Sequence, residues 1–138
     1  MAIKMRVLVA SSKGKMMTLA NNIKNEFDLA PGSVDNIPPA YSCDKERIVI
    51  LAVSGDPKES IVKFCKELNK TRATNVALLV DGTEAAADKL KNVLTEAGTN
   101  VIDEVFYTKC GLPFLKSVKP EEHTALIEWV NKVIKELK

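Results

Sequence analysis

The spacing of hydrophobic residues changes along the chain, and each change predicts a strand or a helix. Short continuous or alternating apolar runs are typical of strands in a sheet that is covered on both faces. These runs are Ile3–Ala10, Arg47–Val53, Val76–Val80 and Val101–Tyr107. A weaker run, Val34–Ile37, is followed by Pro38 and Pro39, which suit a strand at the edge of a sheet. We therefore expect five strands, with the second at an edge.

Between these strands the apolar residues recur every three or four positions, which predicts helices. The four helical stripes run over Met16–Phe27, Ile61–Leu68, Ala86–Ala97 and Leu126–Leu137. Gly98 is expected to end the third helix and Pro120 to start the last one, because these residue types favour the end and the first position of a helix. The connection Pro38–Glu46 is too short for a regular helix.

Strands that alternate with helices pair in parallel through right-handed crossovers. The pattern therefore predicts an α/β fold, a three-layer sandwich that forms a single domain over residues 1–138. Ligands of such sheets bind beyond the carboxyl ends of the strands. The loops at that edge are Ser11–Met16, Ser54–Lys58, Asp81–Glu84 and Thr108–Lys116. A binding site is expected among these four loops.

The composition is that of a globular protein, with 46% hydrophobic and 28% charged residues. Lys and Arg number 20 against 18 Asp and Glu, and these charges are scattered, so nucleic acid is not an expected partner. No run reaches the roughly 20 apolar residues that cross a bilayer, and Met1–Arg6 lacks the order of a signal peptide. We expect a cytoplasmic protein without a membrane partner. Three cysteines without a CxxC pair argue against a disulfide framework.

The first of the four loops leads directly into a helix. It consists of Ser11, Ser12, Lys13, Gly14 and Lys15. Its hydroxyls and backbone amides at the positive end of a helix could surround a phosphate, although the same residues also fit a helix cap followed by solvated lysines. The loop is not that of a nucleoside triphosphatase, because it lacks the first glycine of GxxxxGK[ST] and has Met16 where a hydroxyl must bind magnesium.

The predicted site offers little for catalysis or metal binding. His123 is the only histidine and lies in the first turn of the last helix, away from these loops, so no Ser–His–Asp or Cys–His arrangement can form there. Asp56 and Asp81 each follow a strand and fit either a metal ligand or a helix cap, of which the cap is the commoner role. We expect no catalytic residue and no metal site.

The sequence resembles the flavodoxins, small FMN-binding electron carriers, along its whole length. Their phosphate loop follows an apolar strand and has the form Ser/Thr-x-Thr-Gly-x-Thr. Here Ser11 and Gly14 match that form after Val7–Ala10, whereas Lys13 and Met16 replace two of its threonines. The resemblance implies a flavodoxin-like sandwich with a five-stranded parallel sheet in the order 2-1-3-4-5.

The resemblance also implies FMN as the cofactor and names the residues that would bind it. Ser11, Ser12, Lys13, Gly14, Lys15 and Met16 would hold the phosphate, Ser54, Gly55 and Asp56 the N5 edge of the flavin, and Asp81, Gly82 and Thr83 its pyrimidine side. Gly55 suits its role because a residue without Cβ can rotate its peptide at little cost. Lys13 and Lys15 beside Gly14 predict that FMN is held mainly through its phosphate, with an affinity that falls with salt.

On this resemblance the protein is an electron carrier that serves a redox partner protein, rather than an enzyme in its own right. The sequence departs from the family in two further respects, and an alternative keeps the fold without flavin. Residues 54–60 and 81–87 contain no aromatic residue or Met to cover a flavin ring, and the net charge of +2 differs from the acidic charge typical of flavodoxins. The alternative is a flavin-free protein with the same fold that acts as a protein-interaction or small-anion-binding module.

Overall fold

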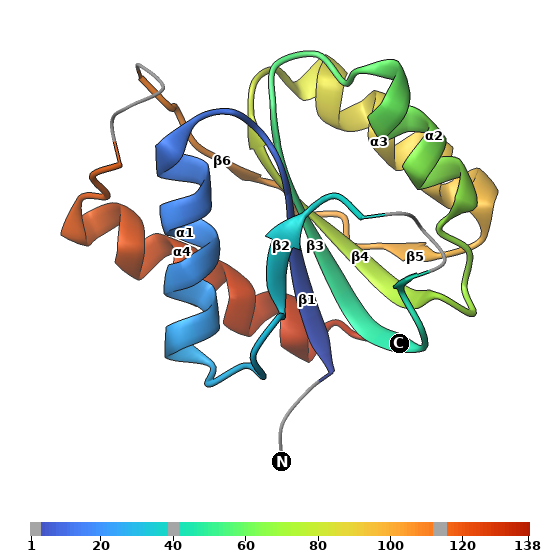
Figure 1. Cartoon of the computed structure of the whole chain (residues 1–138), viewed down its shortest axis with the longest axis horizontal. Coiled ribbons are helices and arrows are strands. Elements are labelled where there is room, and N and C mark those ends of the chain that lie inside the picture. The colour runs from blue at the N-terminus through green and yellow to red at the C-terminus, as the bar shows by residue number, and fades with distance from the viewer. Residues whose placement is uncertain (1–3, 39–41, 112–115) are drawn as a thin grey trace.

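The computed structural model describes residues 4–38, 42–111 and 116–138, and it contains a parallel sheet between two layers of helices (Figure 1). The strands are β1 (Met5–Ala10), β2 (Val34–Asn36), β3 (Glu46–Ser54), β4 (Ala73–Asp81), β5 (Asn100–Val101) and β6 (Phe106–Tyr107). They lie in the order β2-β1-β3-β4-β5, and β6 also pairs with β4. Every pairing is parallel. The predicted α/β class and the order 2-1-3-4-5 are confirmed.

Four helices of the described ranges cover the two faces of this sheet. They are α1 (Gly14–Glu26), α2 (Glu59–Glu67), α3 (Glu84–Ala97) and α4 (Pro120–Lys135). The third ends at Gly98, whose φ of 105° is left-handed, and the last begins at Pro120, both as predicted. Ile3 and Pro39 lie outside the described residues. No helix in the described part of the chain is long and apolar enough to cross a membrane.

The core forms on both faces of the sheet because successive strand residues point to opposite sides. Val7 and Val9 of β1 pack with α1 and α4, whereas Leu8 between them packs with α2 and α3. The central strands β3 and β4 are buried on both faces, which explains why Ile48–Val53 and Val76–Val80 are continuous apolar runs. Each large aliphatic side chain buried in this way contributes about 2 kcal/mol to folding.

The fifth predicted strand, Val101–Tyr107, is wrong as a single element. It is two short strands, β5 and β6, with four residues between them that belong to neither strand. Two of these four residues are bonded to the helices on either side. Lys91 of α3 donates to the carbonyl oxygen of Asp103 at 2.7 Å, and the indole Nε1 of Trp129 in α4 donates to that of Glu104 at 3.0 Å.

Candidate functional site

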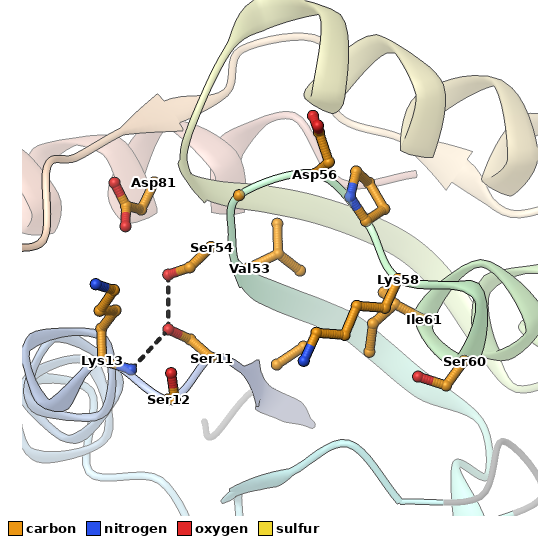
Figure 2. A pocket seen from close by; sticks show the side chains of 13 residues that line it. Ser11, Ser12, Lys13, Val53, Ser54, Asp56, Lys58, Ser60, Ile61 and Asp81 are labelled. Atoms are coloured by element: carbon orange, nitrogen blue, oxygen red, sulfur yellow. Dashed lines mark hydrogen bonds between the residues drawn. The ribbon is translucent and has the colours of Figure 1, made fainter. Parts of the chain in front are cut away.

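A pocket of about 580 Å³ lies at the carboxyl ends of β1, β3 and β4 (Figure 2). Its walls come from the loops after these strands and from the first turn of α2. The lining residues are Ala10, Ser11, Ser12, Lys13, Val53, Ser54, Gly55, Asp56, Pro57, Lys58, Ser60, Ile61 and Asp81. A pocket of this volume falls within the range that holds small-molecule ligands.

The structure brings together part of the set of residues predicted to bind a cofactor. Ser11, Ser12, Lys13, Ser54, Gly55, Asp56 and Asp81 line the pocket, and Gly14, Lys15, Met16, Gly82 and Thr83 do not. The Met16 side chain is fully buried in the core beneath α1, and its amide donates to the carbonyl oxygen of Lys13. The Thr83 hydroxyl accepts a hydrogen bond from the amide of Ala86, so it caps α3.

Hydrogen bonds join the first two loops of the pocket. The hydroxyl oxygens of Ser11 and Ser54 lie 2.6 Å apart, and the Ser11 oxygen also accepts from the Lys13 amide at 3.0 Å. The second loop is in turn tied to the end of β4, because the Gly55 amide donates to the carbonyl oxygen of Asp81 at 2.8 Å. These bonds hold the ends of three neighbouring strands in one fixed arrangement around the pocket.

The helix α1 presents its amino-terminal end to the pocket. Lys13 is its N-cap residue, and no side chain caps the helix there. The first turn of α1 contains no acidic residue. The first amide groups of a helix have no acceptor within the helix and form its positive end. This end of the pocket therefore favours an anionic ligand.

Two lysines of the first loop contact the segment that follows β6. The Lys13 ammonium donates to the carbonyl oxygen of Gly111 at 3.2 Å, and the Lys15 ammonium donates to that of Lys109 at 2.9 Å. The same Lys15 ammonium lies 2.7 Å from a carboxylate oxygen of Glu122 in α4. Lys15 is thus turned away from the pocket and is paired with an acid.

The Glu122 carboxylate is partly buried between these groups. Burial by itself would raise its pKa, but hydrogen bonds from Lys15 and Thr108 outweigh burial, and the pKa is lowered from its ordinary value. Glu122 is therefore ionised at neutral pH and neutralises the Lys15 charge.

Lys58 lines the pocket, although the sequence indicated it only as the end of a loop and assigned it no binding role. It is the N-cap residue of α2, immediately after Pro57, and its side chain extends across the pocket toward the first loop (Figure 2). Among the described residues, no hydrogen-bond or ion-pair partner is found for its ammonium group. The signal that could have found it is its position at the end of the loop Ser54–Lys58, where a helix begins at the same edge of the sheet.

Two further ionisable residues, Cys110 and His123, do not line the pocket. The pKa of the Cys110 thiol is raised to about 11, first by burial and then by the Asp81 carboxylate, so the thiol is protonated at neutral pH. His123 lies on α4, with an imidazole nitrogen 4.0 Å from a carboxylate oxygen of Glu26. Within the ranges that the structure describes, no group of three or more His, Cys, Asp or Glu is placed to hold a metal ion.

The fold is similar to that of solved flavodoxins. A flavodoxin from Streptococcus pneumonia TIGR4 matches with a TM-score of 0.69 and 15% sequence identity, over 96% of this chain and 99% of that one. A short-chain flavodoxin associated with a non-canonical PDU bacterial microcompartment matches with a TM-score of 0.65 and 13% identity, over 98% of each chain. The likeness at these identities establishes a flavodoxin-like fold. No protein-family model and no curated protein sequence matches the chain.

Proposed function

We propose that the pocket binds FMN and that the protein carries electrons to and from a redox partner protein. The observation that carries this proposal is the convergence of three loops, after β1, β3 and β4, on one pocket beside the uncapped amino-terminal end of α1. The flavodoxin-like fold of the chain supports it, because solved flavodoxins share this fold. FMN, when bound, supplies the redox chemistry, and the protein supplies binding and orientation.

The residues present fit the phosphate of FMN. The Lys13 and Met16 amides are bonded within the protein, which leaves the amides of Gly14 and Lys15 at the start of α1 to donate to phosphate oxygens. The hydroxyls of Ser11 and Ser12 lie on the same side of the pocket. Gly55 fits the second loop, because its φ of 71° is a left-handed conformation that favours glycine. Val53, Pro57 and Ile61 supply the apolar part of the lining against which a flavin ring could pack.

A flavin-free module that binds a small anion is the second candidate. The observation in its favour is the absence of any aromatic residue or Met from the pocket lining among the described residues. A stacked aromatic pair contributes about 0.5 to 1.5 kcal/mol beyond the area it buries, so a ring in this pocket would be held less tightly than between aromatic residues.

Equilibrium dialysis of the purified apoprotein against FMN, riboflavin and inorganic phosphate separates the two candidates. The proposal predicts saturable binding of one FMN per chain, with an absorbance band at about 450 nm that remains with the protein after gel filtration. Binding of phosphate without binding of FMN would favour the anion-binding module. No binding of FMN or of phosphate would contradict both candidates.

A further inference from the structure

We propose that Lys58 gives the pocket its preference for an anionic ligand, a role that the sequence pattern suggested for Lys13 and Lys15. This inference rests on the proposed function, because it names the residue that would select FMN over its uncharged counterpart, riboflavin. Lys58 is the N-cap residue of α2 and lies on the opposite side of the pocket from the first loop.

The partners of the three lysines distinguish them. Lys15 is paired with Glu122 at 2.7 Å and does not line the pocket. Lys13 lines it, but its ammonium is bonded to the carbonyl oxygen of Gly111. Lys58 has no such partner among the described residues, so a ligand could bind its ammonium group without breaking a hydrogen bond within the protein.

The backbone at Lys58 is anchored, and this places the start of its side chain at the wall of the pocket. Its carbonyl oxygen accepts hydrogen bonds from the amides of Ile61 and Val62, each at 3.0 Å, which anchors it to the first turn of α2. Pro57 before it restricts the backbone further. Figure 2 shows the side chain directed toward Ser11 and Ser12, the two hydroxyl residues next to the start of α1.

A lysine at this position is unfavourable for the helix. N-cap positions favour Ser, Thr, Asp and Asn, and Lys58 makes no capping bond, while its positive charge lies at the positive end of α2. An anion in the pocket would offset that charge.

Acidic residues nearby leave the Lys58 charge available. Glu59 in the first turn of α2 is exposed and is not part of the lining. Asp56 and Asp81 do line the pocket. Figure 2 shows the Asp56 carboxylate turned away from Lys58, and Asp81 on the far side of Ser54. The half of the pocket between Lys58 and the first loop therefore contains a cation and hydroxyls, which is the chemistry that recognises a phosphate.

The test compares FMN and riboflavin binding by the full chain carrying Lys58→Gln, Lys58→Arg or the control Lys63→Gln. Lys63 is an exposed lysine of α2 outside the lining. We expect Lys58→Gln to weaken FMN binding roughly tenfold and to leave riboflavin binding unchanged. Lys58→Arg should keep most of the affinity, and Lys63→Gln all of it. The salt dependence of FMN binding should be smaller in Lys58→Gln than in the parent protein, since one screened attraction is lost.

Two results would overturn the role of Lys58 while leaving FMN binding intact. They are equal FMN affinity in Lys58→Gln and the parent protein, and an equal loss of affinity for FMN and riboflavin. If the parent protein binds neither flavin, the proposed function fails, and inorganic phosphate becomes the probe. Amide chemical shifts of residues 11–15 and 58–61 that respond to phosphate in the parent but not in Lys58→Gln would then support the anion site at Lys58. No response in the parent would overturn it.

Discussion

Gly55 has a backbone conformation that other residues adopt only at a cost. Its φ is 71°, and a Cβ added there would meet no atom within 4 Å, so the penalty for a larger residue is conformational and not steric. We expect Gly55→Val to lower the free energy of unfolding by about 1 to 2 kcal/mol. The measurement is urea unfolding of the apoprotein, followed by a redox titration with FMN.

The control for Gly55→Val is Gly82→Ala. Gly82 lies beside the Gly55 backbone, and a Cβ there would make only ordinary contacts, the nearest at 3.5 Å from the Val80 side chain. Gly82→Ala should therefore unfold nearly as the parent protein does. A Gly55→Val protein with unchanged stability and an unchanged flavin potential would show that the turn does not need a left-handed residue.

The Cys110 thiol is held in the protonated form by burial and, after burial, by the Asp81 carboxylate, which gives a second prediction for a single residue. Burial and Asp81 together raise the pKa of Cys110 to about 11. Asp81→Asn should lower that pKa and speed alkylation of Cys110 by iodoacetamide at pH 8, since the thiolate is the reactive form. Mass spectrometry of the alkylated peptide gives the rate.

Cys65 serves as an internal reference in the same alkylation experiment. Burial alone raises the pKa of Cys65 to about 12, and its reaction rate should not change in Asp81→Asn. If Cys110 reacts at the same rate in both proteins, the carboxylate does not act on the thiol.

Among the elements, the contact between the starts of α1 and α4 depends on pH. The folded-state pKa of Glu122 is lowered, so its ionised form stabilises the fold above the unfolded pKa of about 4.5, and that contribution is lost as the pH falls through the folded pKa. Glu122→Gln should cost about 1 kcal/mol of unfolding free energy at pH 7 and almost nothing near about pH 3. Urea unfolding at several pH values measures both.

Glu121→Gln is the matched control for the pH experiment, because Glu121 is exposed in the same first turn of α4. The Glu121 carboxylate lies at the same positive end of α4, but among the described residues Lys15 forms its ion pair with Glu122 and not with Glu121. A pH dependence of stability that is the same in Glu121→Gln and Glu122→Gln would assign the effect to the helix end and not to the pair between Lys15 and Glu122.

The elements that could be predicted from sequence are those whose buried residues follow a regular spacing, either consecutive in the central strands or every three to four positions in the helices. The runs Arg47–Val53 and Val76–Val80 are apolar throughout because both faces of β3 and β4 are covered. The break between β5 and β6 could not be predicted, because Asp103 and Glu104 between the two strands are bonded to side chains of other elements, Lys91 and Trp129. Hydrophobic spacing carries no record of such bonds.

The candidate site also has a part that could be predicted from sequence and a part that could not. The loops after β1, β3 and β4 follow from the topology, since parallel strands bring their carboxyl ends to one edge. The direction of each lysine does not follow from it. Lys15 is drawn to Glu122, 107 positions later by residue number, and Lys58 remains in the pocket. A charge partner from a distant part of the chain thus turns Lys15 away from the pocket.

At the scale of the whole molecule, the two helical layers differ in how far apart their parts lie in the sequence. The layer of α2 and α3 packs on one face of β3 and β4, and these four elements lie in the continuous stretch Glu46–Ala97, although Leu8 of β1 also belongs to that face. The layer of α1 and α4 joins the two ends of the chain, and the bond from Lys13 to Gly111 spans 98 positions. Closing a longer segment of chain costs more entropy and slows folding.

The two helical layers also become complete at different times during protein synthesis, when the chain leaves the ribosome from its amino terminus. The segment Glu46–Ala97 can begin to fold as soon as it emerges, whereas the apolar face of α1 is completed only when α4 is made, after the other three described helices. A chain arrested on the ribosome before Pro120 should bind a hydrophobic dye and be protected from proteolysis in 46–97 but not in α1. Protection of α1 in that arrested chain would mean that the first helix finds its place on the sheet without the last.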